Sequence, residues 1–178
     1  AGVPLLRQSQ IASFADMTAG IRVLGAAVGA DERAEALVRD IEIALAEADR
    51  RVGRARRVRV LYFDPRGYTM GAGTIVDEIL SRAGGRNVAL ALGLRGPGEI
   101  GVEALFALEP EAIVMPRYDD VMPALAALSR NEIWNRVPAV AAGRLYGVPA
   151  AWVNTESFHA ARGLSRVARL LHPEAFAG

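Results

Sequence analysis

The chain has 178 residues, of which 52% are hydrophobic, 23% are charged and 6% are aromatic. That length is enough for one full core, and the composition excludes a disordered chain and favours an α/β domain over an all-β one. A formal charge of +1 excludes a strong overall field for nucleic acid, the absence of cysteine excludes thiolate and disulfide chemistry, and no apolar run approaches the length of a membrane-spanning helix.

Two helices are predicted in the first part of the chain. Ser13 and Asp16 form a capping pair at the start of the first helix, and Gly29 ends it. Residues 31–52 carry a continuous apolar stripe at helical spacing, which predicts a second helix about 33 Å long. A short apolar run at residues 3–6 precedes both helices and suits a strand.

Strands and helices alternate in the rest of the chain. Apolar patterns predict strands at 58–63, 112–115 and 144–148, and helical spacing predicts helices at 74–83, 101–108 and 121–129. A last helix, capped by Asn154 or Thr155, should continue until Pro173. This alternation predicts a mainly parallel sheet that helices cover on both faces.

In such a sheet, ligands bind in the loops beyond the carboxyl ends of the strands. Here those loops are residues 64–72, 117–120 and 149–154. Arginine binds carboxylate, hydroxamate or catecholate oxygens with parallel donors, and aromatic rings cover flat ligands. The alternative for each residue is an ordinary exposed loop position. The candidate ligand-binding residues are Arg66, Tyr68, Thr69, Met70, Arg117, Tyr118, Trp152 and Asn154.

The glycine-rich turn from Gly71 to Thr74 has two interpretations. Its backbone amides could hold a phosphate, which would make the protein a small nucleotide-dependent α/β enzyme. However, no lysine follows the turn and no general base stands beside it, so a tight turn with Thr74 as helix N-cap is favoured. A third possibility is an interaction module that dimerises through exposed faces.

The histidines and the arginine-rich segment predict neither a metal site nor a nucleic-acid partner. His159 and His172 are thirteen residues apart, which is about 3.6 helical turns, so they do not share a helix face. Arginines crowd residues 50–59 without interleaved aromatic residues, which is typical of a helix C-terminus followed by the solvent side of a strand.

Two blocks of sequence resemble a known family. They are GYTMGAGTIVDEILSRAGGRNVA at residues 67–89 and IGVEALFALEPEAIVMP at residues 100–116. They resemble the C-terminal lobe of the periplasmic substrate-binding proteins that deliver iron-siderophore complexes, haem or cobalamin to ABC importers. The resemblance covers nearly the whole chain. It implies an α/β C-terminal lobe at 54–178, a long inter-lobe helix at 31–53, and a remnant of the N-terminal lobe at 1–30.

The same resemblance implies a binding protein without catalytic residues or a cofactor, located in the periplasm or anchored by lipid outside the cytoplasmic membrane. Its expected ligand is a ferric siderophore or related metal chelate, with cobalamin or haem as alternatives. Its expected partners are the inner-membrane ABC permease and the missing N-terminal lobe. Glu103 stands where the family carries an acidic residue that docks onto the permease. The alternative for Glu103 is a first-turn glutamate that interacts only with the helix dipole.

Overall fold

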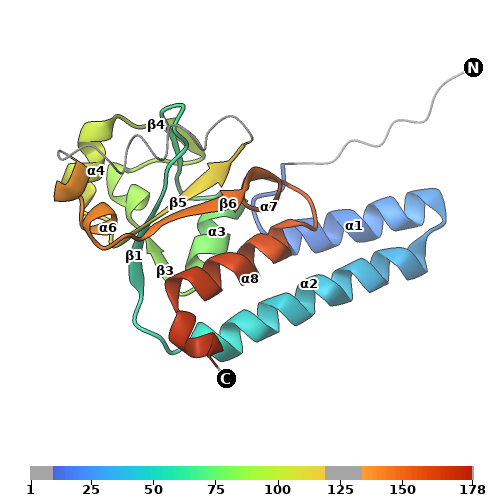
Figure 1. Ribbon diagram of the computed structural model, residues 1–178. Coiled ribbons are helices and arrows are strands. Elements are labelled where there is room, and N and C mark those ends of the chain that lie inside the picture. Colours follow the sequence, from blue (N-terminus) through green and yellow to red (C-terminus); the bar gives the residue numbers. More distant parts are fainter. Residues whose placement is uncertain (1–9, 119–133, 178) are drawn as a thin grey trace, which may run out of the picture.

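The structure is a computed structural model that describes residues 10–118 and 134–177 (Figure 1). A four-stranded sheet, with all strands parallel and in the order β3-β1-β5-β6, forms its centre. This arrangement confirms the predicted α/β class. The strands are Val58–Tyr62 (β1), Gly85–Asn87 (β3), Ala112–Arg117 (β5) and Leu145–Pro149 (β6).

Helices cover both faces of this sheet. Val60 and Tyr62 of β1 belong to one hydrophobic cluster, whereas Leu61 and the following Phe63 belong to another. Successive strand residues therefore feed two cores, one on each face. The first core includes α2 (Asp31–Val52), α3 (Ile75–Arg82) and α8 (Ala160–Leu171), and the second includes η1 (Val88–Leu92), α4 (Val102–Leu108), η2 (Trp134–Arg136) and α6 (Pro138–Ala141).

The two N-terminal helices pack side by side and project beyond the sheet (Figure 1). At the start of α1 (Phe14–Val28), the Ser13 hydroxyl accepts a hydrogen bond from the Asp16 backbone at 3.0 Å. Gly29 ends α1 in the left-handed region, with φ of 66°, which glycine adopts without a Cβ clash. The capping residues thus act where the sequence predicted them. The predicted strand at 3–6 lies outside the described residues.

A second, two-stranded antiparallel sheet was not predicted. It pairs β2 (Tyr68–Met70) with β4 (Pro97–Glu99). The segment that was predicted as one loop, residues 64–72, therefore contains a strand. Strands of three residues are too short to show an apolar period in the sequence. The three-residue strand β3 was not predicted for the same reason.

The last helix begins later than predicted. Residues Ala150–Val153 form the short helix α7, and α8 starts only at Ala160. Neither predicted cap acts as one, because the Asn154 amide bonds to Tyr118 and the Thr155 hydroxyl bonds to Ser157. The helix does end before Pro173, at which η3 (Pro173–Phe176) begins. The predicted helix at 121–129 lies outside the described residues.

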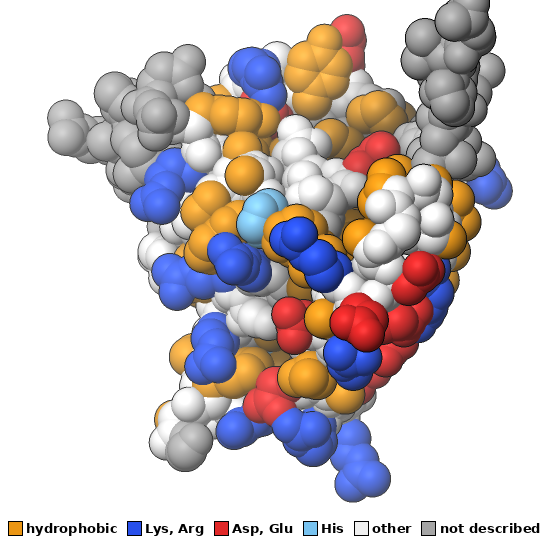
Figure 2. All heavy atoms as spheres, turned by 90° about the vertical axis from the view of Figure 1, so that its right-hand side faces the viewer, with side chains coloured by type: hydrophobic (Ala, Val, Ile, Leu, Met, Phe, Trp, Pro, Cys, Tyr) orange, Lys and Arg blue, Asp and Glu red, His pale blue; other side chains and the backbone are white. Residues whose placement is uncertain are grey.

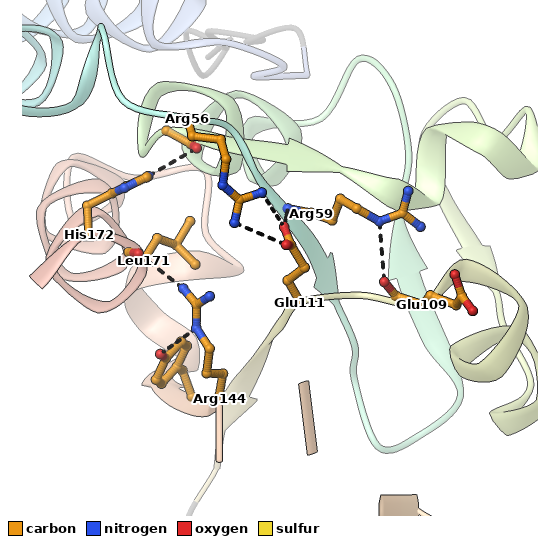
Figure 3. Close-up of polar contacts among 9 residues, drawn as sticks. Arg56, Arg59, Glu109, Glu111, Arg144, Leu171 and His172 are labelled. Atoms are coloured by element: carbon orange, nitrogen blue, oxygen red, sulfur yellow. Dashed lines mark hydrogen bonds and ion pairs between the residues drawn. The ribbon is translucent and has the colours of Figure 1, made fainter. Parts of the chain in front are cut away.

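Two arginines, one at the start of β1 and one just before β6, bind the carbonyl ends of helices (Figure 3). Arg59 donates to the carbonyl of Leu108, the last residue of α4, at 2.6 Å and to the carbonyl of Glu109, its C-cap, at 3.3 Å. Arg144 donates to the Leu171 carbonyl at the end of α8, at 3.1 Å. Positive side chains at these positions complement the negative ends of helix dipoles. These arginines therefore have structural partners.

Candidate functional site

Three loops at the carboxyl edge of the main sheet meet in one polar cluster. Arg66 lies after β1, Tyr118 follows β5, and Asn154 follows α7. The Arg66 Nη2 donates to the Tyr118 hydroxyl at 2.6 Å, and the Asn154 Nδ2 donates to the same oxygen at 3.3 Å. Together with Asp64, to which Tyr118 donates at 3.3 Å, these residues are called the polar cluster below.

Asp64 fixes the position of Arg66. The residue is only 3% exposed, and its carboxylate accepts from the Arg66 backbone and Nε at 3.0 Å each and from Nη2 at 2.7 Å. Burial by itself would raise the pKa of Asp64, but the hydrogen bonds and charge of Arg66 hold that pKa below its ordinary value. In turn, the hydrogen bond and the negative charge of Asp64 raise the pKa of Arg66. Both groups are therefore charged at neutral pH.

Arg66 keeps one side open to solvent. Its side chain is 62% exposed, and its guanidinium carbon lies 4.5 Å from the centroid of the Tyr118 ring. Within the described part of the chain, its Nη1 makes no hydrogen bond or ion pair. The fork to Asp64 and the stacked ring fix the plane of the guanidinium. The free Nη1 can therefore donate to an oxygen atom of a ligand.

Sequence reasoning missed Asp64 of the polar cluster and Tyr62 beside it. Residue 64 was only the first residue of a predicted loop, and residue 62 only lay within a predicted strand. Tyr62 is fully buried, and its hydroxyl has no hydrogen-bond partner among residues 10–118 and 134–177. Burial, and next the nearby Tyr118 and Asp64, raise the pKa of Tyr62, so its hydroxyl stays protonated. An acidic residue at the end of a buried strand, with arginine two positions later, was the signal for Asp64.

A cavity of about 290 Å³ adjoins the cluster through Asn154. Met70 from β2 and Thr74 at the start of α3 also line it. Two predicted ligand residues, Met70 and Asn154, are thus brought to one hollow. The other lining residues are Gln10, Ile11, Ile75, Val76, Pro97, Thr155 and Glu156.

The remaining predicted ligand residues lie in different settings. Tyr68, in β2, is 43% exposed, and Arg117 is an exposed residue at the end of β5. Thr69 is fully buried and donates to the Tyr62 carbonyl at 2.6 Å, so it holds β2 against β1 and is not open to a ligand. Trp152 lines a separate groove between α2 and α8.

The first two backbone amides of the glycine-rich turn are used within the fold. The Gly71 amide donates to the Gly96 carbonyl at 2.8 Å, and the Ala72 amide donates to the Leu94 carbonyl at 3.0 Å. These amides are therefore occupied. The Thr74 hydroxyl accepts from a backbone N–H of α3 at 3.1 Å, as expected for an N-cap. The interpretation favoured by the sequence, a tight turn with Thr74 as helix N-cap, is thus confirmed.

The described residues offer no evident metal centre or membrane span. His172 is buried, with its Nε2 3.1 Å from the Gly84 carbonyl, whereas His159 precedes α8 at the other end of that helix. Residues 10–118 and 134–177 contain no group of three or more metal-ligating side chains. None of the helices formed by these residues is long and apolar enough to cross a membrane.

Glu103 lies in the first turn of α4 and is exposed. Its carboxylate folds back over Gly101, where it would collide with an added Cβ atom. Gly101 therefore leaves room for the carboxylate at the helix start, although it supplies no side-chain cap. Both the dipole interpretation and the docking interpretation agree with this position.

The fold and the sequence match known binding proteins. A family model for periplasmic binding proteins matches residues 1–151. An uncharacterized ABC transporter substrate-binding lipoprotein of Bacillus subtilis (strain 168), YvrC, is 26% identical over 182 residues, covering 99% of this chain and 56% of the relative.

Two solved structures have the same fold. The apo periplasmic heme-binding protein RhuT from Roseiflexus sp. RS-1 has a TM-score of 0.78 at 21% identity, covering 92% of this chain and 65% of that one. The ABC-type Fe3+-hydroxamate transport system structure from Saccharomonospora viridis DSM 43017 has a TM-score of 0.79 at 20% identity, covering 93% and 57%. The chain therefore spans between about half and two thirds of the length of these proteins. The family consists of binding proteins and not of enzymes, and the chain belongs to the periplasmic binding protein family.

Proposed function

We propose that the protein is a solute-binding component of an ABC importer, which captures a ferric siderophore or related metal chelate and delivers it to the membrane permease. Family membership supports the binding role. The observation that carries the proposal is the meeting of three loops at Arg66, Tyr118 and Asn154, at the edge where parallel sheets bind ligands.

The polar cluster suits a flat ligand that is rich in oxygen atoms. The open Nη1 of Arg66 and the exposed Arg117 can donate to hydroxamate, catecholate or carboxylate oxygens. Tyr68 and Tyr118 offer aromatic surface, and Met70 offers a soft apolar one. Cobalamin or haem is the alternative ligand of the same fold.

The chain would form one lobe of a two-lobed protein. In this proposal residues 1–30 are the remnant of an N-terminal lobe, 31–53 join the lobes, and 54–178 are the ligand-binding lobe. Val23, Leu24 and Val28 of α1 are 53%, 45% and 74% exposed, which provides apolar surface for a further lobe. The continuous hydrogen bonds of α2 would resist bending, so ligand capture would require only a small closing motion.

A periplasmic family supports a location in the periplasm or, as in the relative named a lipoprotein, on a lipid anchor outside the cytoplasmic membrane. At the outer face of the cytoplasmic membrane, Glu103 would dock onto arginines of the permease. Reversal of its charge, in Glu103→Arg, should leave ligand affinity unchanged while import falls. Glu32→Arg, in the first turn of α2, is the matched control and should change neither. Equal losses of affinity and import in Glu103→Arg would reject the docking role.

Fluorescence of the whole protein, titrated separately with ferric hydroxamate, ferric catecholate, cobalamin, haem and ATP, tests the ligand class. We expect saturable quenching by a ferric chelate, weakened about tenfold in Tyr118→Phe because that variant removes the shared hydroxyl. Arg86→Gln, an exposed arginine on β3, should leave the titration unchanged. Quenching by ATP alone would overturn the proposal in favour of the enzyme, and no response to any ligand would favour an interaction module.

A further inference from the structure

A second hollow, with a volume of about 390 Å³, lies between α2 and α8. Its apolar walls come from three parts of the chain: Leu37, Ile41 and Ala44 of α2, Trp152 of α7, and Phe158 before α8. This hollow is called the α2–α8 groove below. None of its lining residues belongs to the polar cluster or to the cavity beside it.

Three arginines of α8 line the groove. Arg162, Arg166 and Arg169 are spaced i, i+4 and i+7, which places them on one helix face, and all are exposed. In Figure 2, basic side chains lie among hydrophobic ones over the left half of the molecule, whereas acidic side chains gather toward the lower right of the view. Among the described lining residues Asp40 is the only acidic one, so three arginines against one aspartate give this part of the groove a formal charge of +2.

The arginines nearest the aromatic end lack partners in the described part of the chain. Neither the Arg162 nor the Arg166 side chain forms a hydrogen bond or ion pair with residues 10–118 or 134–177. Arg169 instead lies over the Phe176 ring, 4.7 Å from its centroid. By contrast, Arg66, Arg59 and Arg144 elsewhere are held by acceptors. Two guanidinium groups therefore line this hollow without an ion-pair partner among residues 10–118 and 134–177, although Asp40 also lines it.

We propose that the α2–α8 groove binds a small amphipathic carboxylate, with an aromatic or short aliphatic body, at a site separate from the metal chelate. The volume falls within the range of about 300–1,000 Å³ that is typical of small-molecule sites. That volume suits one ring system or a short chain. The ring would lie against Trp152 and Phe158, and the carboxylate would accept parallel hydrogen bonds from Arg162 or Arg166.

Isothermal titration of the 178-residue chain with 1-naphthoate, and with its neutral analogue 1-naphthalenemethanol, tests this site. We expect 1-naphthoate to bind with one site per chain and the alcohol to bind about tenfold more weakly or not at all, since only the carboxylate meets the arginines. The double variant Arg162→Gln, Arg166→Gln should weaken naphthoate binding about tenfold and leave any alcohol binding unchanged.

Two controls keep the test specific. The double variant Arg86→Gln, Arg95→Gln removes two exposed arginines outside the groove and should bind naphthoate like the original chain. Ala44→Phe fills the groove and should abolish binding of both probes. Failure of naphthoate to bind at millimolar concentration, equal affinity for acid and alcohol, or equal weakening by both double variants would overturn the proposal. So would loss of binding in step with dimer formation in sedimentation, because a second copy would then cover the groove.

Discussion

Substitution of Asp64 by asparagine should destabilise the protein by removing the anion on which the polar cluster depends. Asp64 accepts four hydrogen bonds: three come from Arg66, and the fourth comes from Tyr118. Asparagine keeps the size of the side chain but loses its charge, and its amide nitrogen cannot accept from Arg66 or Tyr118. The variant therefore tests the charge rather than the packing.

The expected loss of unfolding free energy depends on the burial of Asp64 and on the exposure of its partner Arg66. Hydrogen bonds to charged groups contribute roughly 1.5–3 kcal/mol each, and two of the four would be lost in the variant. Asp64 is 3% exposed, but the Arg66 side chain is 62% exposed, so water weakens part of the interaction. We expect the free energy of unfolding to fall by about 2 kcal/mol at pH 7.

This loss should depend on pH. The folded-state pKa of Asp64 is lowered, so its stabilising contribution is present above the unfolded-state pKa of about 4 and disappears as pH falls through the folded-state pKa. Urea unfolding followed by circular dichroism at pH 7 and pH 3 should therefore show a difference between the original chain and Asp64→Asn that shrinks at the lower pH.

The matched control is Asp49→Asn. Asp49 also pairs with an arginine, Arg82, at 3.3 Å, but its side chain is 61% exposed, so its loss should cost only about 0.5 kcal/mol. If Asp64→Asn and Asp49→Asn had equal effects, or if the effect of Asp64→Asn were the same at both pH values, the assignment of Asp64 as the buried anion of the cluster would be wrong.

Three further substitutions, two of them with a matched comparison variant, test the fold by thermal and urea unfolding. Gly84→Ala should cost about 2–4 kcal/mol, since φ is 81° and the new Cβ would collide with the His172 ring; Gly29→Ala, with φ of 66° and open space, should cost only about 1–2 kcal/mol. Thr74→Ala should cost about 1 kcal/mol by removing the cap of α3, and Thr74→Ser should restore most of it. Leu105→Ala should cost about 2–5 kcal/mol, because Leu105 is fully buried under the sheet; an effect below 1 kcal/mol would contradict that packing.

Much of the fold could be predicted because the residues that start and end its helices contact residues only a few positions away in the chain. Ser13 caps α1, Gly29 ends it, and Thr74 caps α3, each through contacts within a few residues. The parallel sheet followed from alternating patterns, and the rule that ligands bind at carboxyl ends selected the three loops that meet in the polar cluster. The bond that joins the first two loops, from Arg66 to Tyr118, spans 52 residues and has no local signal.

The sequence alone determined the α/β class, the capped helices and the loops in which to look for a ligand, since these depend on residue type and short-range spacing. Only the tertiary structure decided that Thr69 of β2 is buried against β1, and that Asp64 holds Arg66. It also decided that Trp152 lines a groove between α2 and α8, whereas Asn154, two residues later, reaches Tyr118. The physical reason is that a side chain's direction and its partner are set by which distant segments pack beside it, and three-residue strands such as β2 form only because a distant partner supplies their hydrogen bonds.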